Sequence, residues 1–348
     1  MSPMILTLFL LSLGLGTTIT FASSHWLLAW MGLEINTLAI LPLMAQHPHP
    51  RAVEATTKYF LTQATAAAMI LFASATNAWY TGEWCITDMS SPLSMTMVIM
   101  ALALKLGLAP VHFWLPEVLQ GLNLTTGLVL STWQKLAPFI LLIQIPLPNH
   151  TLMTLLALLS VLVGGWGGLN QVQTRKILAY SSIAHLGWML LISQFSTPLA
   201  LLALFTYILM TTPAFLILKF THATTINSLA SSWTKSVVLT ALTPLVLFSL
   251  GGLPPLSGFA PKWLILQELT KQGLPIVATL AAMMALLSLY FYLRLSYSLA
   301  LTMAPNTPPA SAPWRSIPQQ SSSLLAITTM MSILMLPIMP STLSLFYL

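Results

Sequence analysis

The sequence KLGLAPVHFWLPE, residues 105–117, places a charged side chain within five residues of a helix-breaking proline. An apolar run that begins near Pro92 leads into it, so Lys105 lies ~20 Å along the helix at ~1.5 Å per residue. In a hydrocarbon core ~30 Å thick this ammonium is deep in the membrane if the helix resumes beyond Pro110. Pro110 has no N–H, so the carbonyl of Leu106 loses its helical partner. Because polar backbone at this depth is tolerated only inside protein or beside water, the segment indicates an ion path.

The composition excludes a soluble globular protein. Of the 348 residues, 57% are hydrophobic and only 5% are charged, whereas roughly 25% are charged in typical soluble domains. A membrane β-barrel would instead show short segments of alternating hydrophobicity. We therefore expect an all-α polytopic membrane protein that contacts the lipid bilayer. The net charge of +6 does not indicate a nucleic-acid partner, because the basic residues are scattered and fall largely in loops on one side.

About eleven apolar stretches have the length of a membrane-spanning helix. They cover residues 3–21, 25–45, 56–80, 92–118, 124–145, 150–171, 176–195, 198–220, 237–270, 275–300 and 322–346. We expect a single membrane domain, 1–348, with a five-helix repeat at 1–146, a second at 147–300, and a polar loop with a C-terminal helix at 301–348. The loop, about 301–321, is rich in Pro and Ser and is expected to wrap over the surface.

The ninth stretch, 237–270, is too long for one straight helix, since it would extend ~50 Å. Its middle, SLGGLPPLSGFAPKW, holds a Gly-Gly and a Pro-Pro pair that break the helix, and Lys262 follows seven residues after Pro255. The fourth and ninth stretches are thus both interrupted beside a lysine. Because five is odd, consecutive five-helix units have opposite orientations, and broken helices at matching places in inverted repeats indicate a transporter's ion site.

The distribution of Lys and Arg predicts the orientation. Loops or ends after even-numbered stretches carry Arg51, Lys58, Arg175, Lys176, Lys219, Lys235, Arg294 and Arg315. Those after odd-numbered stretches carry only Lys271, together with Glu83, Asp88 and Glu268. The N-terminus is therefore expected on the cytoplasm-equivalent side of the membrane and the C-terminus on the opposite side.

Four ionisable residues are expected at membrane depth: Glu34, Lys105, Lys135 and Lys262. Each costs ~2.5–3.5 kcal/mol to insert, or on the order of 10–14 kcal/mol together. Structural ion pairs account for at most one pair, because three lysines face one glutamate. Burial lowers the pKa of an amine and a nearby carboxylate raises it, so a lysine with a changing partner can load and release a proton. We expect Glu34 to modulate Lys105, Lys135 to connect Lys105 with Lys262, and Lys262 to be the terminal site of the proton relay.

Two histidines are candidates for the same relay. His112 follows the first interruption, His185 lies in the seventh stretch, and the pKa of an imidazole suits proton transfer. The alternative for each is a buried, hydrogen-bonded histidine, while haem ligation is disfavoured because no further paired intramembrane histidines are present. Cys85 is the only cysteine, and one thiolate cannot hold a zinc or iron–sulfur site alone. Since GxGxxG, GxxxxGK[ST] and CxxC motifs are also absent, we expect no cofactor or metal in this chain.

Three segments resemble the signatures of one family. RKILAYSSIAHLG (175–187), ALKLGLAPVHFWLPE (103–117) and GGLPPLSGFAPKW (251–263) are similar to motifs of the antiporter-like subunits of respiratory complex I, and of multisubunit cation/proton antiporters. The family fold has fourteen helices with two inverted five-helix repeats. The eleven stretches here would therefore lack the first three helices and keep both repeats.

The resemblance implies a role for each candidate residue. The family's helix-five glutamate, broken-helix-seven lysine, helix-eight lysine and broken-helix-twelve lysine fall on Glu34, Lys105, Lys135 and Lys262, and its bridging histidines on His112 and His185. It further implies a proton-translocating subunit in the mitochondrial inner membrane, with its N-terminus in the matrix and other membrane-arm subunits as partners. NADH, FMN, iron–sulfur clusters and ubiquinone would belong to the holoenzyme, outside this chain.

Two functions of other classes are compatible with the same residues. A cation/proton antiporter subunit, freestanding or in a multisubunit complex, would need its own coupling-cation site and activity without redox partners. A scaffold subunit would use the buried charges for assembly and conduct nothing.

Overall fold

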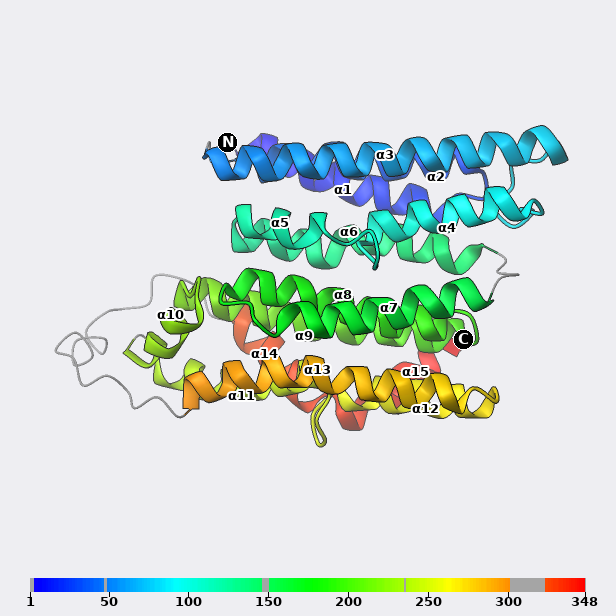
Figure 1. Ribbon diagram of the computed structural model, residues 1–348. Helices are drawn as coiled ribbons and strands as arrows, with labels where there is room; N and C mark the ends of the chain where they lie inside the picture. Colours follow the sequence, from blue (N-terminus) through cyan, green and yellow to red (C-terminus); the bar gives the residue numbers. More distant parts are fainter. Residues whose placement is uncertain (1–2, 47–48, 146–149, 235, 301–322, 348) are drawn as a thin grey trace. The chain divides into compact units, whose positions relative to one another are not determined.

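The computed structural model describes residues 3–46, 49–145, 150–234, 236–300 and 323–347. The chain forms two compact units, Met1–His150 (unit 1) and Thr151–Leu348 (unit 2). Across the described ranges the regular elements are all helices (Figure 1). The predicted surface loop at about 301–321, with Arg315, lies outside the described residues, as does Lys235.

The described part of unit 1 contains six helices. They are α1 (Pro3–Ala22), α2 (Trp26–Met44), α3 (Pro50–Thr81), α4 (Pro92–Leu106), α5 (Trp114–Gly121) and α6 (Leu124–Gln144). Helix α1 packs on α2, α3 packs on α2, α4 and α5, and α6 contacts α1, α2 and α4. The loop before α2 is joined to the loop before α4, since Ile86 N–H donates to the Ser24 carbonyl at 2.9 Å.

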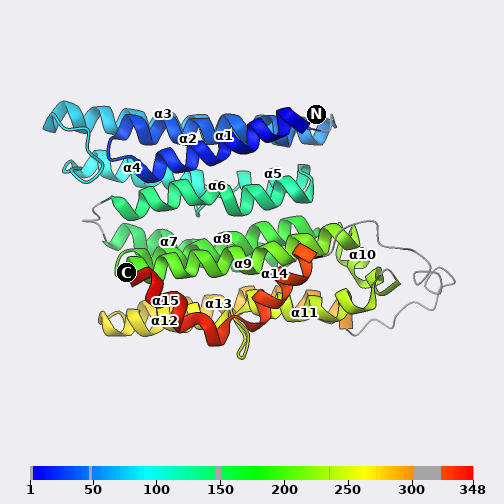
Figure 2. The ribbon, with the colours of Figure 1, turned by 180° about the vertical axis from the view of Figure 1, so that it is seen from behind.

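Unit 2 is also helical throughout its described residues. Its elements are α7 (His150–Gly168), α8 (Thr174–Ser193), α9 (Thr197–Thr221), α10 (Ile226–Ala230), η1 (Ser231–Thr234), α11 (Val237–Gly251), α12 (Phe259–Lys271), α13 (Pro275–Ala300), α14 (Ser323–Leu334), η4 (Leu336–Ile338) and α15 (Met339–Tyr347). Helix α9 is central, because α8, α11, α12, α14 and α15 all pack against it. Figure 2 shows α14 and α15 crossing this side of the unit obliquely.

Most predicted stretches coincide with helices to within a few residues, but two of them differ, and one segment between stretches is also helical. Helix α3 begins at Pro50 instead of residue 56, because proline suits the first helical position and His49 Nδ1 accepts from Arg51 N–H at 3.2 Å. The short α10 and η1 occupy a segment expected to be loop. The expected single C-terminal helix is wrong: α14 and α15 are bent by 67°, and Pro337 at the bend lacks the N–H that a continuous helix needs.

By length and composition, eight of the described helices can cross a membrane, or nine if the bent pair α14–α15 forms one span. Helices α4 and α11 are apolar but short, at 15 residues each. Each is followed after a brief connection by a second helix, α5 or α12. Both predicted interruptions are therefore present as pairs of half-helices.

The two interruptions are built alike. Each first half-helix is followed by a glycine with positive φ, 80° at Gly107 and 78° at Gly252, whose N–H bonds back to two carbonyls of the last turn. Glycine is favoured there because a Cβ is unfavourable in the left-handed conformation. The spacing is also equal, since α11 and α12 start at Val237 and Phe259, each 145 positions after the starts of α4 and α5.

The second interruption depends on a close approach at Gly258. A Cβ at this position would overlap the carbonyl oxygen of Ser249 in α11. We expect Gly258→Ala to destabilise the folded protein by about 1–3 kcal/mol, as overpacking does, because the start of α12 must move away from α11. The measurement is the level of folded protein in membranes and its heat-inactivation temperature. Gly14→Ala is the control, since its Cβ would meet nothing within 4 Å; equal losses in both variants would contradict this prediction.

Candidate functional site

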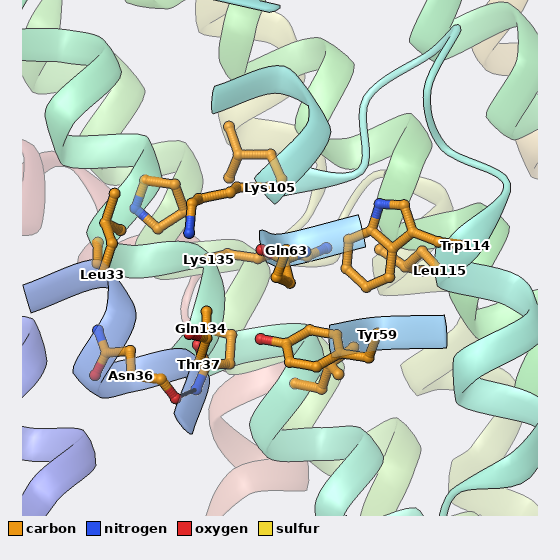
Figure 3. Close-up of a pocket in the computed structure, with 14 residues that line it drawn as sticks. Leu33, Asn36, Thr37, Tyr59, Gln63, Lys105, Trp114, Leu115, Gln134 and Lys135 are labelled. Atoms are coloured by element: carbon orange, nitrogen blue, oxygen red, sulfur yellow. Dashed lines mark hydrogen bonds between the residues drawn. The ribbon is translucent and has the colours of Figure 1, made fainter. Parts of the chain in front are cut away.

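A small cavity in unit 1 is lined by two of the predicted lysines (Figure 3). Its volume is about 20 Å³, and it lies among α2, α3, α4, α5 and α6. Lys105, in the last turn of α4, and Lys135, in the middle of α6, are buried to 6% and 2% exposure. The other polar side chains in its lining are Asn36, Thr37, Tyr59, Gln63, Trp114 and Gln134. The packing of α2, α3, α4, α5 and α6 thus brings two amines that are 30 positions apart in the chain to the same cavity.

Glu34 lies on α2 at the side of this cavity. Its carboxylate Oε2 accepts a hydrogen bond from the hydroxyl of Thr37, one turn further on, at 3.0 Å. The Glu34 charge is near enough to act on the Lys105 ammonium. Among the described ion pairs, however, none within 4.0 Å joins Glu34 to Lys105. The Glu34 carboxylate is therefore held by Thr37 and not by a lysine among the described contacts.

The indole of Trp114 connects the two half-helices at the first interruption by a hydrogen bond. Trp114 Nε1–H, at the start of α5, donates to the carbonyl of Leu104 in the last turn of α4 at 3.0 Å. The same carbonyl also accepts from Gly107 N–H at 3.2 Å, so the indole adds a second hydrogen bond at the end of α4. The Lys105 ammonium lies in the same turn, where the helix dipole carries partial negative charge that favours a cation.

His112 lies in the connection between α4 and α5 and is buried. Its ring contacts that of Phe113, with centroids 4.3 Å apart. It is not part of the lining of the Lys105–Lys135 cavity. The structure therefore places His112 beside the first interruption, but not in the cavity that the two lysines share.

In unit 2, His185 and Lys262 line a second cavity of about 20 Å³. Lys262 Nζ–H donates to the carbonyl of Gly251, the last residue of α11, at 2.7 Å. His185, from α8, is buried, and its ring centroid lies 5.6 Å from that of Tyr207 on α9. Two predicted residues that are far apart in sequence are thus brought together, and the ammonium sits at the negative end of a half-helix.

Lys105 and Lys262 lie on opposite sides of their respective interruptions. Lys105 belongs to the half-helix before the first break, and Lys262 to the half-helix after the second. At the 145-position spacing, Lys262 corresponds to Glu117, which accepts a hydrogen bond from Lys58 Nζ at 2.7 Å on the exposed side of α5. Both ammonium groups nevertheless end near the carboxyl end of a first half-helix, because Lys262 reaches back across the break.

Sequence reasoning did not single out the polar neighbours of the lysines. Asn36, Gln63 and Gln134 are uncharged, but each lies inside an apolar helix, and that placement was the available signal. Gln134 Nε2–H donates to the backbone carbonyl of Asn36 at 3.3 Å and so ties α6 to α2. For metal binding, the described residues contain no group of three His, Cys, Asp or Glu side chains close enough to hold an ion.

Two family models match this chain. The model described as NADH:quinone oxidoreductase/Mrp antiporter, TM, matches residues 23–288. The model described as NADH dehydrogenase subunit 2 C-terminus matches residues 289–343. Together they cover the two cavities and both interruptions.

Individual proteins are similar over nearly the full length. NADH-ubiquinone oxidoreductase chain 2 of Salmo salar is 70% identical over 342 residues, which is 98% of each chain. A chain in the structure of respiratory complex I from Thermus thermophilus is 30% identical with a TM-score of 0.81, covering 97% of this chain and 80% of that one. A chain of the Mrp complex from a Dietzia species is similar in fold, with 16% identity, a TM-score of 0.76, and coverage of 97% and 74%.

Proposed function

Since this chain belongs to the NADH-ubiquinone oxidoreductase chain 2 family, we propose that it is a proton-translocating membrane subunit of complex I. The observation that carries this proposal is the pair of cavities, each lined by at least one lysine of an interrupted helix. Protons move through this chain while NADH oxidation and ubiquinone reduction occur elsewhere in the complex. NADH, FMN, iron–sulfur clusters and ubiquinone belong to other parts of the holoenzyme, which include the partner membrane-arm subunits.

In the proposed relay, Glu34 modulates the charge of Lys105, and Lys105 exchanges protons with Lys135 across their shared cavity. Lys262 is the terminal proton site, and His185 is its neighbour in the same cavity. His112 takes part in the relay at the first interruption. Buried ionisable groups are costly in a membrane and are by default functional. The shared linings of the two cavities support the pairs Lys105–Lys135 and His185–Lys262.

We propose eleven membrane crossings arranged as two inverted five-helix repeats, 1–146 and 147–300, with the bent α14–α15 pair as the last crossing. The equal spacing of the interruptions supports this arrangement. So does a bridge between loops that recurs in each unit, at His25 with Cys85 and at Gln173 with Thr225. In both cases the loop before the second helix of the repeat pairs with a loop after its third.

The location proposed is the inner mitochondrial membrane, with the N-terminus on the matrix side. The name of the fish relative supports a respiratory complex, and the excess of Lys and Arg after even-numbered stretches supports the orientation. The competing function is a cation/proton antiporter subunit, favoured by the family description that includes Mrp antiporters. Co-purification with flavin and iron–sulfur subunits distinguishes the two.

Glu34→Gln tests the modulating carboxylate. The amide keeps an oxygen for the Thr37 hydroxyl but removes the charge that acts on Lys105. We expect turnover of the assembled complex to fall roughly fivefold, the change that about 1 kcal/mol of lost charge stabilisation produces. NADH:ubiquinone turnover and proton uptake are measured together. Glu83→Gln, in an exposed loop, is the control, and normal rates with Glu34→Gln would count against the assigned role.

A further inference from the structure

The connection between α11 and α12, residues 252–258, is bonded to a helix from the C-terminal end of the chain. Ser257 in this connection is 2% exposed, and its hydroxyl donates a hydrogen bond to the backbone carbonyl of Ser332 in α14, 75 positions later. Ser332 is itself fully buried. Because the bond is buried and joins distant segments, it fixes α14 directly to the second interruption.

The bend between α14 and α15 makes the Ser332 carbonyl available for this bond. Helix α14 ends at Leu334, so Ser332 lies in its last turn, where carbonyls have no partner within the helix. In a continuous helix the partner would be the N–H of Leu336, which lies in η4 beyond the end of α14. Pro337 opposes a continuous helix because it has no N–H. The proline at the bend thus leaves an acceptor for the Ser257 hydroxyl.

Apolar packing adds a second contact, at the first turn of α12. Met335 and Met339, on either side of the bend, form a buried cluster with Leu202 of α9, and Ala260 packs against this cluster. Ala260 is two positions before Lys262. The α14–α15 pair therefore contacts both the 252–258 connection and the start of the helix that carries the lysine.

The 252–258 connection in turn contacts the lysine. A Cβ added at Gly252 would lie 3.0 Å from Lys262 Nζ, and this Nζ–H donates to the carbonyl of Gly251 at 2.7 Å. Gly258, next to Ser257, lines the same cavity as Lys262. A shift of the connection therefore moves both the acceptor of the ammonium and one wall of its cavity.

We propose that Ser257 is a positioning residue for Lys262, and that the α14–α15 pair holds Ser257 in place through the Ser332 carbonyl. The inference rests on the proposed function and gives the two C-terminal helices a part in it. The Ser257 hydroxyl acts through the connection and takes up no proton itself. It fixes residues 252–258, so that the Gly251 carbonyl stays within reach of the Lys262 ammonium.

Ser257→Ala tests this role, because it removes the hydroxyl and leaves a side chain of nearly the same size. We expect proton uptake per assembled complex to fall about fivefold, which corresponds to about 1 kcal/mol, the net contribution of one hydrogen bond. Ser257→Thr, which keeps the hydroxyl, is expected to restore most of the rate. Proton uptake and NADH:ubiquinone turnover are measured per assembled complex on material quantified on a native gel, so that a role in assembly alone would leave both rates unchanged.

Ser288→Ala is the matched control. Ser288 is also a buried serine of unit 2, and its hydroxyl donates to the Ala285 carbonyl within its own helix, α13, at 2.7 Å. Proton uptake is expected to stay close to that of the wild type. Equal losses in Ser257→Ala and Ser288→Ala would show that removing any buried hydroxyl slows the complex, and would overturn the proposal.

The outcomes separate this inference from the proposed function. Wild-type proton uptake in Ser257→Ala, with Lys262→Met inactive, would overturn the positioning role and leave the function standing. Normal pumping in Lys262→Met would instead reject the relay at this lysine.

If Ser257→Ala does not assemble, Pro337→Ala tests the same contact from the side of α14. The regained N–H lets the helix continue through the bend, so that the Leu336 N–H competes with Ser257 for the Ser332 carbonyl. A lower proton uptake per assembled complex in this variant supports the positioning role, and an unchanged uptake overturns it.

Discussion

Lys105→Met is expected to lower NADH:ubiquinone turnover and proton uptake of the assembled complex by at least about 10-fold, because a positioned proton-transfer group contributes roughly 100-fold or more. The side chain lies at the end of α4 and lines the cavity that it shares with Lys135. Methionine fills similar space but cannot carry a proton. The loss is therefore expected in the rate per assembled complex, with assembly on a native gel retained.

Lys105→Arg separates charge from proton transfer. Arginine keeps the positive charge near Glu34, but it is not deprotonated in proteins, so it cannot release the proton. We expect this variant to assemble and to be as slow as Lys105→Met. Lys271→Met is the matched control, since the Lys271 side chain is 63% exposed and its one ion pair among the described residues is a long contact of 3.9 Å with Glu268. Recovery of pumping in the arginine variant would show that the charge alone is required.

Lys262→Met is the second large expected effect and bears on the scaffold alternative. The Nζ–H of Lys262 bonds to the carbonyl that ends α11, so the amine both closes the second interruption and faces the cavity of His185. We expect proton uptake per assembled complex to fall by at least about 10-fold. A modest loss of stability is also expected, because a hydrogen bond to a charged group contributes ~1.5–3 kcal/mol.

Lys262→Arg then decides between relay and scaffold. Arginine retains a donor for the Gly251 carbonyl and holds its proton, so a relay stays blocked while a scaffold is restored. The measurements are complex level on a native gel, and protons taken up per NADH oxidised by the assembled fraction. Gln267→Met, an exposed polar position on the same helix, controls for substitution in α12. Full pumping in Lys262→Arg, or loss of assembly without loss of pumping in Lys262→Met, favours the scaffold.

The helices and both interruptions could be predicted because their causes are local. A long apolar stretch is helical in a membrane whatever surrounds it, and the Gly-Leu-Ala-Pro and Gly-Leu-Pro-Pro segments end a helix through glycine at positive φ and the missing N–H of proline. The bend between α14 and α15 had the same kind of signal in Pro337. It was missed because the stretch has the right length for one crossing.

The residues that lie next to each charged residue in the folded structure could not be predicted in the same way. Apolar helices show little periodicity, so the sequence does not indicate which face of α3 meets α4 and α5. The amides of Asn36 and Gln63 therefore gave no sign of sharing a cavity with Lys105.

By itself, the sequence determined that this is a helical membrane protein with ionisable residues at depth and two broken helices, since hydropathy and proline act along the chain. Only the tertiary structure decided that Lys105 and Lys135 line one cavity and that His185 and Lys262 line another. It also decided that Glu34 bonds to Thr37 instead of to a lysine. Those contacts join segments that are distant in sequence or depend on one rotamer. They are set by how the helices pack, and packing is a property of the whole unit.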